Sequence, residues 1–261
     1  MSIHLENLWF RYPDTENYII QSICWKKDIP GTIGLLGTNG SGKTTLLKLI
    51  SGIISPSKGN ILINGNQIKK EKLKKIVVFV PENARLFLVG PTPREDLNRI
   101  IKDQSQTDRL IDQFSFNDLA DKKLYHLSEG QRRLIAIFHA FQVPSQFVLL
   151  DEPTVGLDFR GRQLLFHLFE EAKNQGKFVF VSSNDSRVFP QMDELIVIHS
   201  GTLYVNGSPK VVLYEIEKNT DLIPNQIIRL ITTLEDELDK ELPHFLTAEE
   251  FSQFIADGKM F

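Results

Sequence analysis

Nine consecutive residues near the N-terminus have the composition of a phosphate-binding loop. Three glycines are interspersed with small polar residues and followed by a lysine, in the order Gly37, Thr38, Asn39, Gly40, Ser41, Gly42, Lys43, Thr44 and Thr45. Glycines let backbone N–H groups converge on a phosphate at a helix N-terminus, where the helix dipole favours anions. The Lys43 ammonium would pair with the β- and γ-phosphates, and the Thr44 hydroxyl would coordinate Mg²⁺. The loop therefore predicts a site for a nucleoside triphosphate and Mg²⁺.

Two consecutive carboxylates, Asp151 and Glu152, follow the apolar run of residues 147–150. In open α/β sheets, ligands bind at the carboxyl ends of the strands, which is where this pair would lie. We expect Asp151 to hold the Mg²⁺ shell and Glu152 to act as the general base that polarises the attacking water. The alternative is an acidic pair that only ends a strand. Because the pair follows a phosphate-binding loop in the sequence, we favour a role in hydrolysis of the nucleotide.

The elements around these residues form a strand-loop-helix unit and its neighbours. Apolar residues 33–36 precede the loop and an amphipathic stretch at 43–50 follows it, as the motif requires. Residues 3–12 and 19–29 predict two antiparallel strands on either side of a turn at 13–17. Further short apolar runs predict strands, and those framed by helices should form a buried parallel sheet: 61–63, 76–80, 147–150, 178–181 and 195–198. Residues from about 91 to 143 are helical in period and predict a helical subdomain inserted between sheet strands.

A third motif, Leu127-Ser128-Glu129-Gly130-Gln131, begins an apolar-periodic segment. Ser128 and Gln131 have the spacing of a capping box, in which each side chain bonds the other residue's backbone N–H. Taken alone, the motif predicts an ordinary helix start.

The loop, residues 127–131 and Asp151-Glu152-Pro153 occur in that order, and this ordered set resembles the ABC-type ATPases. The resemblance extends over residues 1–208. It implies an α/β fold of the ABC-type P-loop ATPase class, with a mainly parallel core sheet, an antiparallel β subdomain, the inserted helical subdomain and a small helical C-terminal extension. It also implies ATP and Mg²⁺ as cofactors. Tyr12, before the turn at 13–17, matches the aromatic residue that stacks on adenine in this family.

The same resemblance implies that each site is shared between two ATPase subunits. Ser128, Gly130 and Gln131 would contact the γ-phosphate of ATP held by the opposite subunit, and Asp158 lies in the loop that links the two sites. Glu129 stands where the family usually has glycine, so its carboxylate either points away from the nucleotide or weakens closure. The partner is thus a second ABC ATPase, in a homodimer or a heterodimer, and we mildly favour the heterodimer.

Two residues depart from the family pattern at the reaction centre. Glu82 stands where the family has glutamine, and Asn184 stands where it has histidine. A carboxylate can coordinate Mg²⁺ as well as an amide oxygen can, but Glu82 adds negative charge beside the γ-phosphate. Asparagine forms hydrogen bonds but cannot carry a proton charge. We hypothesise that the site of this chain hydrolyses ATP slowly.

Residues 10–14, 86–87 and 92–97 and the C-terminal tail resemble the ATPases of energy-coupling-factor (ECF) importers, which take up vitamins or metal ions. By this resemblance, Glu95 and Asp96 would lie at a groove for the coupling helices of an integral membrane subunit. The alternative is that they only favour a helix start, because acidic residues suit the first turn. Three other functions stay open: the ATPase of an exporter, a low-turnover regulatory partner, and a soluble ABC protein of translation or DNA repair.

The 261 residues suggest an ATPase domain at 1–208 and a helical extension at 209–261 that serves dimerisation or wraps its own domain. Helix starts are expected at Pro209 and Pro224, and Thr247 with Glu250 forms a second capping-box pattern. The net charge of −3 does not favour nucleic acid as a partner. The single cysteine, Cys24, fits a reducing compartment. No apolar run approaches the roughly 20 residues of a membrane span, so we expect a peripheral protein at the cytoplasmic face of the cell membrane.

Overall fold

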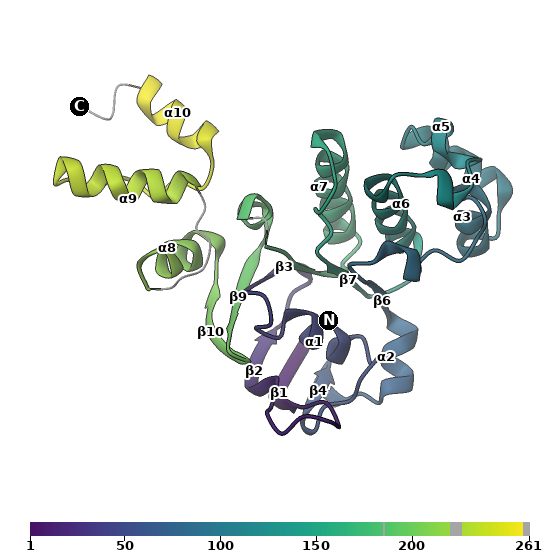
Figure 1. The fold of residues 1–261 in the computed structure, drawn as a ribbon, viewed down its shortest axis with the longest axis horizontal. Helices are drawn as coiled ribbons and strands as arrows, with labels where there is room; N and C mark the ends of the chain where they lie inside the picture. The colour runs from purple at the N-terminus through teal and green to yellow at the C-terminus, as the bar shows by residue number, and fades with distance from the viewer. Residues whose placement is uncertain (185, 220–225, 258–261) are drawn as a thin grey trace.

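The computed structural model describes residues 1–184, 186–219 and 226–257, and Figure 1 shows their arrangement. The N-terminal part contains an antiparallel sheet in the order β2-β1-β4-β5. Its strands are β1 (Ile3–Phe10), β2 (Ile20–Lys27), β4 (Lys58–Ile63) and β5 (Asn66–Gln67). The predicted antiparallel pairing of the first two strands is confirmed by the register of β1 against β2.

The second sheet has the order β10-β9-β3-β8-β7-β6, and only the edge strand β10 runs antiparallel to its neighbour. Its strands are β3 (Gly31–Leu36), β6 (Val77–Val80), β7 (Phe147–Asp151), β8 (Phe178–Ser182), β9 (Glu194–His199) and β10 (Thr202–Gly207). Every residue of β3, β7 and β8 is buried, as expected for parallel strands covered on both faces. One face packs against helix α1 (Lys43–Ile50) and the antiparallel sheet, and the other against helices α6 and α7.

Between β6 and β7 the chain forms helices and no strand. These are α3 (Pro93–Ile101), α4 (Gln104–Gln113), α5 (Asn117–Ala120) and α6 (Glu129–Gln142), with short 3₁₀ turns at Ala84–Leu86 and Leu124–His126. Phe138 of α6 packs between Phe114 and Phe116 and is fully buried, which joins α6 to the rest of this group. The group lies beyond the β6 end of the sheet (Figure 1). Helices α2 (Lys70–Ile76) and α7 (Phe159–Asn174) complete the core, and the predicted fold class is confirmed.

The C-terminal tail forms helices α8 (Pro209–Asn219), α9 (Gln226–Leu238) and α10 (Ala248–Ala256), on the opposite side of the molecule from α3–α5 (Figure 1). Thr247 and Glu250 form the predicted capping box at the start of α10. The helix start predicted at Pro224 lies outside the described residues. Leu230 and Ile255 leave 43% of their surface exposed, so the tail keeps apolar surface in contact with solvent. No helix in the described part of the chain is long and apolar enough to cross a membrane.

Candidate functional site

The phosphate-binding loop leaves the carboxyl end of β3, at the centre of the parallel sheet, and leads into α1 at Lys43. Gly40 and Gly42 have φ angles of 78° and 112°, a left-handed conformation that strongly favours glycine. A Cβ atom at Gly37 would lie 2.3 Å from the carbonyl oxygen of Ile198. The three glycines therefore allow a turn tight enough to present backbone N–H groups to a phosphate.

Lys43 is buried within this loop and is 7% exposed. Its ammonium donates hydrogen bonds to the carbonyl oxygens of Gly37 at 2.8 Å and Thr38 at 3.2 Å, and to Asn184 Oδ1 at 3.2 Å. Burial lowers the pKa of Lys43, and the negative charge of Glu152 opposes that shift. The ammonium is thus held at the position from which it can reach the phosphates of a nucleotide.

Asp151 lies at the end of β7, 5% exposed, and its carboxylate is bonded only by hydroxyl groups among the contacts described. Thr44 Oγ1 donates to its two oxygens at 2.9 and 3.0 Å, and Ser182 Oγ donates at 2.5 Å. A hydroxyl and a carboxylate side by side are oxygen ligands of the kind Mg²⁺ takes together with substrate phosphates. The described residues contain no cluster of three or more His, Cys, Asp or Glu that could hold a metal unaided. The pair therefore fits a cation that is shared with a bound nucleotide.

Glu152 follows with a φ of 50°, a strained backbone conformation for a residue with a side chain. Its Oε2 accepts the backbone N–H of Asn184 at 3.1 Å. Burial raises the pKa of Glu152, although the Asn184 N–H and the charge of Lys43 oppose the shift. A carboxyl with a raised pKa is a better proton acceptor near neutral pH than an exposed one.

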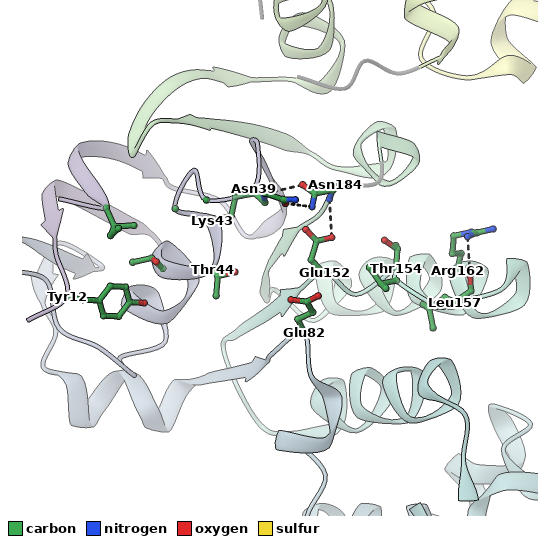
Figure 2. Close-up of a pocket in the computed structure, with 16 residues that line it drawn as sticks. Tyr12, Asn39, Lys43, Thr44, Glu82, Glu152, Thr154, Leu157, Arg162 and Asn184 are labelled. Atoms are coloured by element: carbon green, nitrogen blue, oxygen red, sulfur yellow. Dashed lines mark hydrogen bonds between the residues drawn. The ribbon is translucent and has the colours of Figure 1, made fainter. Parts of the chain in front are cut away.

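These residues surround one cavity of about 850 Å³ (Figure 2). The structure brings together the predicted residues Tyr12, Asn39, Gly40, Gly42, Lys43, Thr44, Thr45, Glu82, Glu152 and Asn184 along its wall. The other predicted residues of the loop and the strand end do not line the cavity: Gly37, Thr38, Ser41 and Asp151. Thr154, Val155, Gly156 and Leu157 also line the cavity, in the loop that the sequence assigned to the link between the two sites. Ile19 and Arg162 line it as well and were not predicted, because nothing near them in the sequence indicated a site.

Asn184 forms hydrogen bonds with both the phosphate-binding loop and Glu152. Its Nδ2 donates to Asn39 Oδ1 at 3.0 Å, while its Oδ1 accepts from Lys43 and its N–H bonds Glu152 (Figure 2). The side chain of Glu82, exposed after the end of β6, points toward the cavity beside Glu152 (Figure 2). Asn184 thus forms three hydrogen bonds at this position but brings no titratable group to it.

The residues assigned to the opposite subunit lie outside this cavity. The predicted capping box is confirmed: Ser128 Oγ accepts the Gln131 N–H at 3.1 Å, and Gln131 Oε1 accepts the Ser128 N–H at 2.9 Å. Asp158 caps α7 through the N–H of Gly161 at 2.7 Å. Gly130, in the first turn of α6, is partly exposed, and Ser128 and Asp158 are exposed. Their contact with a second nucleotide stays a prediction.

The assignment of Asp96 to the membrane-subunit surface is wrong. Asp96 is 5% exposed, and its Oδ1 accepts the N–H groups of Val89 at 2.9 Å and Gly90 at 2.6 Å. Its Oδ2 lies 2.8 Å from Nδ1 of the buried His139. Burial alone would raise the pKa of Asp96, but these hydrogen bonds hold it below its ordinary value. Asp96 therefore fixes the 89–90 segment to α6, while Glu95 is exposed and its assignment stays a prediction.

Comparison with known proteins identifies relatives across nearly the whole chain. Residues 29–155 match the profile of the family described as ABC transporter. The energy-coupling factor transporter ATP-binding protein EcfA of Methanocaldococcus jannaschii is 30% identical over 82% of this chain and 82% of its own length. EcfA2 of Caldanaerobacter subterraneus subsp. tengcongensis is 30% identical over 98% of this chain and 96% of its own. The structure of cbiO1 from Clostridium perfringens, part of the ABC transporter complex cbiONQ, shares the fold with a TM-score of 0.70 at 24% identity, covering 88% of this chain and 98% of that one.

The pKa of Glu152 predicts the pH dependence of ATP turnover. If Glu152 is the general base, it must be ionised, so kcat/KM for ATP falls as the pH drops through the pKa of Glu152 in the free protein. Because burial raises that pKa, the loss begins at a higher pH than it would for an exposed glutamate. The pH profile of kcat/KM for ATP checks this, with the affinity for a fluorescent ATP analogue measured at each pH as the control. A kcat/KM that stays constant down to the pH range in which an exposed carboxyl titrates would refute the assignment of Glu152 as the general base.

If Glu82 and Asn184 slow the reaction, then the double variant Glu82→Gln/Asn184→His should hydrolyse ATP about tenfold faster or more, because a titratable group returns beside Glu152. Steady-state turnover of the full chain measures the effect. Asn174→His, at the exposed end of α7, is the matched control and should change nothing. A double variant no faster than the wild type would show that both residues are tolerated replacements.

Proposed function

Because this chain belongs to the ABC transporter ATP-binding family, and therefore hydrolyses ATP in support of transport, we propose that it powers an ECF-type importer. The observation that carries the proposal is the pair of relatives named as energy-coupling factor ATP-binding proteins. The match to EcfA2 covers 98% of this chain and so includes the C-terminal tail beyond residue 208. A vitamin or a metal ion is the substrate class we propose, since ATPases of this kind power such uptake.

In the proposed reaction, the backbone N–H groups of the loop and Lys43 bind the phosphates of ATP, and Tyr12 stacks on the adenine. Thr44, Asp151 and the Glu82 carboxylate would hold Mg²⁺, which supplies charge neutralisation at the phosphates. Asn184 occupies one oxygen of Glu152, and the other takes a proton from the attacking water. Each of these side chains lines the cavity or lies next in sequence to a lining residue, and the Lys43 ammonium must exchange at least one of its three hydrogen bonds for a phosphate oxygen.

ABC ATPases work as dimers with membrane subunits, and we propose the same assembly here. Ser128, Gly130, Gln131 and Asp158 would complete the site of a second ATPase subunit, with a heterodimer mildly favoured. Residues 1–208 would form the ATPase unit and residues 209–261 an extension that contacts the second subunit. The exposed Leu230, Leu238 and Ile255 support that role, because an extension that only wrapped its own domain would bury them.

For the membrane subunit we propose a second groove, whose wall includes Arg132 of α6. It has a volume of about 410 Å³, and its lining combines apolar residues with three basic ones: Arg85, Leu88, Gly90, Pro91, Lys123, Leu124, Tyr125 and Arg132. Tyr125, which lines the groove, is 74% exposed, and Leu86, next in sequence to the lining residue Arg85, is 75% exposed, which is unusual for large apolar side chains. The groove would receive an amphipathic coupling helix from the membrane subunit. Docking there would hold this chain peripherally at the cytoplasmic face of the membrane.

The groove predicts a specific assembly defect. Leu86→Ser/Tyr125→Ser should weaken co-purification with the membrane subunit by about tenfold or more, because one exposed apolar side chain of the groove and one next to its lining residue Arg85 are both lost. ATP affinity should stay unchanged. Ile29→Ser, which changes an apolar side chain 74% exposed between β2 and β3, is the matched control. Glu95→Ala tests the remaining acidic contact in the same assay.

Unchanged assembly by the double variant would contradict the groove, and the identity of the membrane protein that co-purifies with the wild type tests the import proposal separately. A transmembrane subunit that exports its substrate would overturn ECF-type uptake while leaving the ATPase assignment intact.

A further inference from the structure

Arg133, on the first turns of α6, is a buried cation whose main partners are backbone carbonyls. It is 3% exposed. Its Nη2 donates to the carbonyl oxygen of Glu82 at 2.6 Å, and its Nη1 donates to the carbonyl oxygen of Val155. Its Nε is buried without a hydrogen-bond partner among the described residues. A buried guanidinium is costly unless it is well paired, so this placement needs a structural or functional reason.

The two carbonyls belong to separate segments of the nucleotide cavity. Glu82 follows β6 and Val155 follows the Asp151–Glu152 pair, and both residues line the cavity. Gly130, one turn before Arg133 on the same helix face, fits against the next residue of the second segment. A Cβ atom at Gly130 would lie 2.2 Å from the carbonyl oxygen of Gly156. The start of α6 thus contacts both segments, through the hydrogen bonds of Arg133 and the close packing of Gly130.

The charge of Arg133 also accounts for the direction of Glu129. Glu129 Oε1 lies 3.5 Å from Arg133 Nη2, one helical turn away, and the Glu129 side chain is 75% exposed. The attraction draws the carboxylate along the helix toward Arg133. An acidic residue within the motif 127–131 is therefore compatible with a neighbouring triphosphate, because its charge is partly balanced within the helix.

We propose that Arg133 is a positioning residue for ATP hydrolysis, which holds the Glu82 and Val155 segments in register with the helix turn that carries Ser128 and Gly130. Through it, a force on that turn from a partner subunit reaches the residues beside Glu152. Arginine suits the role because its planar fork meets two carbonyls from different segments, whereas the lysine ammonium is a single point. The proposal rests on the ATPase activity of the family and not on the direction of transport.

The test compares the full-length wild type with Arg133→Met and Arg133→Lys. Amide hydrogen exchange in residues 82–90 and 154–158 should become about tenfold faster or more in both variants, because charge-assisted hydrogen bonds are lost. ATP turnover should fall about tenfold, while the affinity for a fluorescent ATP analogue stays within about threefold, because the loop and Lys43 are untouched. Arg133→Lys keeps the charge, but it should reach neither the amide protection nor the ATP turnover of the wild type.

Arg94→Met is the control for general damage to the helical region. Arg94 bonds Asp108 and Asp121, and it does not line the nucleotide cavity. This variant should leave exchange in the two segments and turnover near the wild-type values. If Arg133→Met does not fold, Arg133→Lys alone decides the question by the same measurements. The proposal is overturned if either segment keeps its wild-type protection in the folded Arg133 variants, if lysine restores turnover, or if Arg94→Met causes the same losses.

Discussion

The site depends on one buried carboxylate, that of Asp151. A buried carboxylate must be compensated by hydrogen bonds or charge, and here hydroxyl groups from α1 and β8 provide the bonds. Thr44 brings the end of the phosphate loop to β7, and Ser182 brings the end of β8 to the same point. Glu152 follows Asp151 directly, and Asn184 lies two residues after Ser182. The loop, the base and the residue that contacts both are therefore assembled around a single acidic group.

The molecule presents three candidate functional surfaces, and α6 contributes to each of them or contacts a segment that does. The nucleotide cavity is built from the sheet, α1 and the segments at Glu82 and Val155. The exposed Ser128 lies outside it, at the N-terminus of α6. Asp96 and His139 fix the segment near the groove to the same helix. This arrangement places α6 between the nucleotide cavity, the surface proposed for a second subunit and the groove, so a shift of this helix would affect all three.

Features encoded over a few residues could be predicted from the sequence. The glycine loop, the capping boxes at Ser128 and Thr247 and the buried strands depend on local conformation and on patterns of apolar residues. Contacts between distant segments could not be predicted. Asp96 looked like an ordinary acidic residue of a first helical turn, but its environment depends on His139, 43 residues away. The sequence yielded no prediction for Arg133, because neither carbonyl that it binds is near it in sequence.

The most direct test of this account is ATP hydrolysis by the purified full chain with Glu152 replaced by glutamine. Glutamine keeps the shape of the side chain but cannot accept the proton. The account predicts that hydrolysis falls by about a hundredfold or more, while the affinity for ATP is retained because the loop and Lys43 are unchanged. Hydrolysis near the wild-type rate would contradict it, because the base would then lie elsewhere.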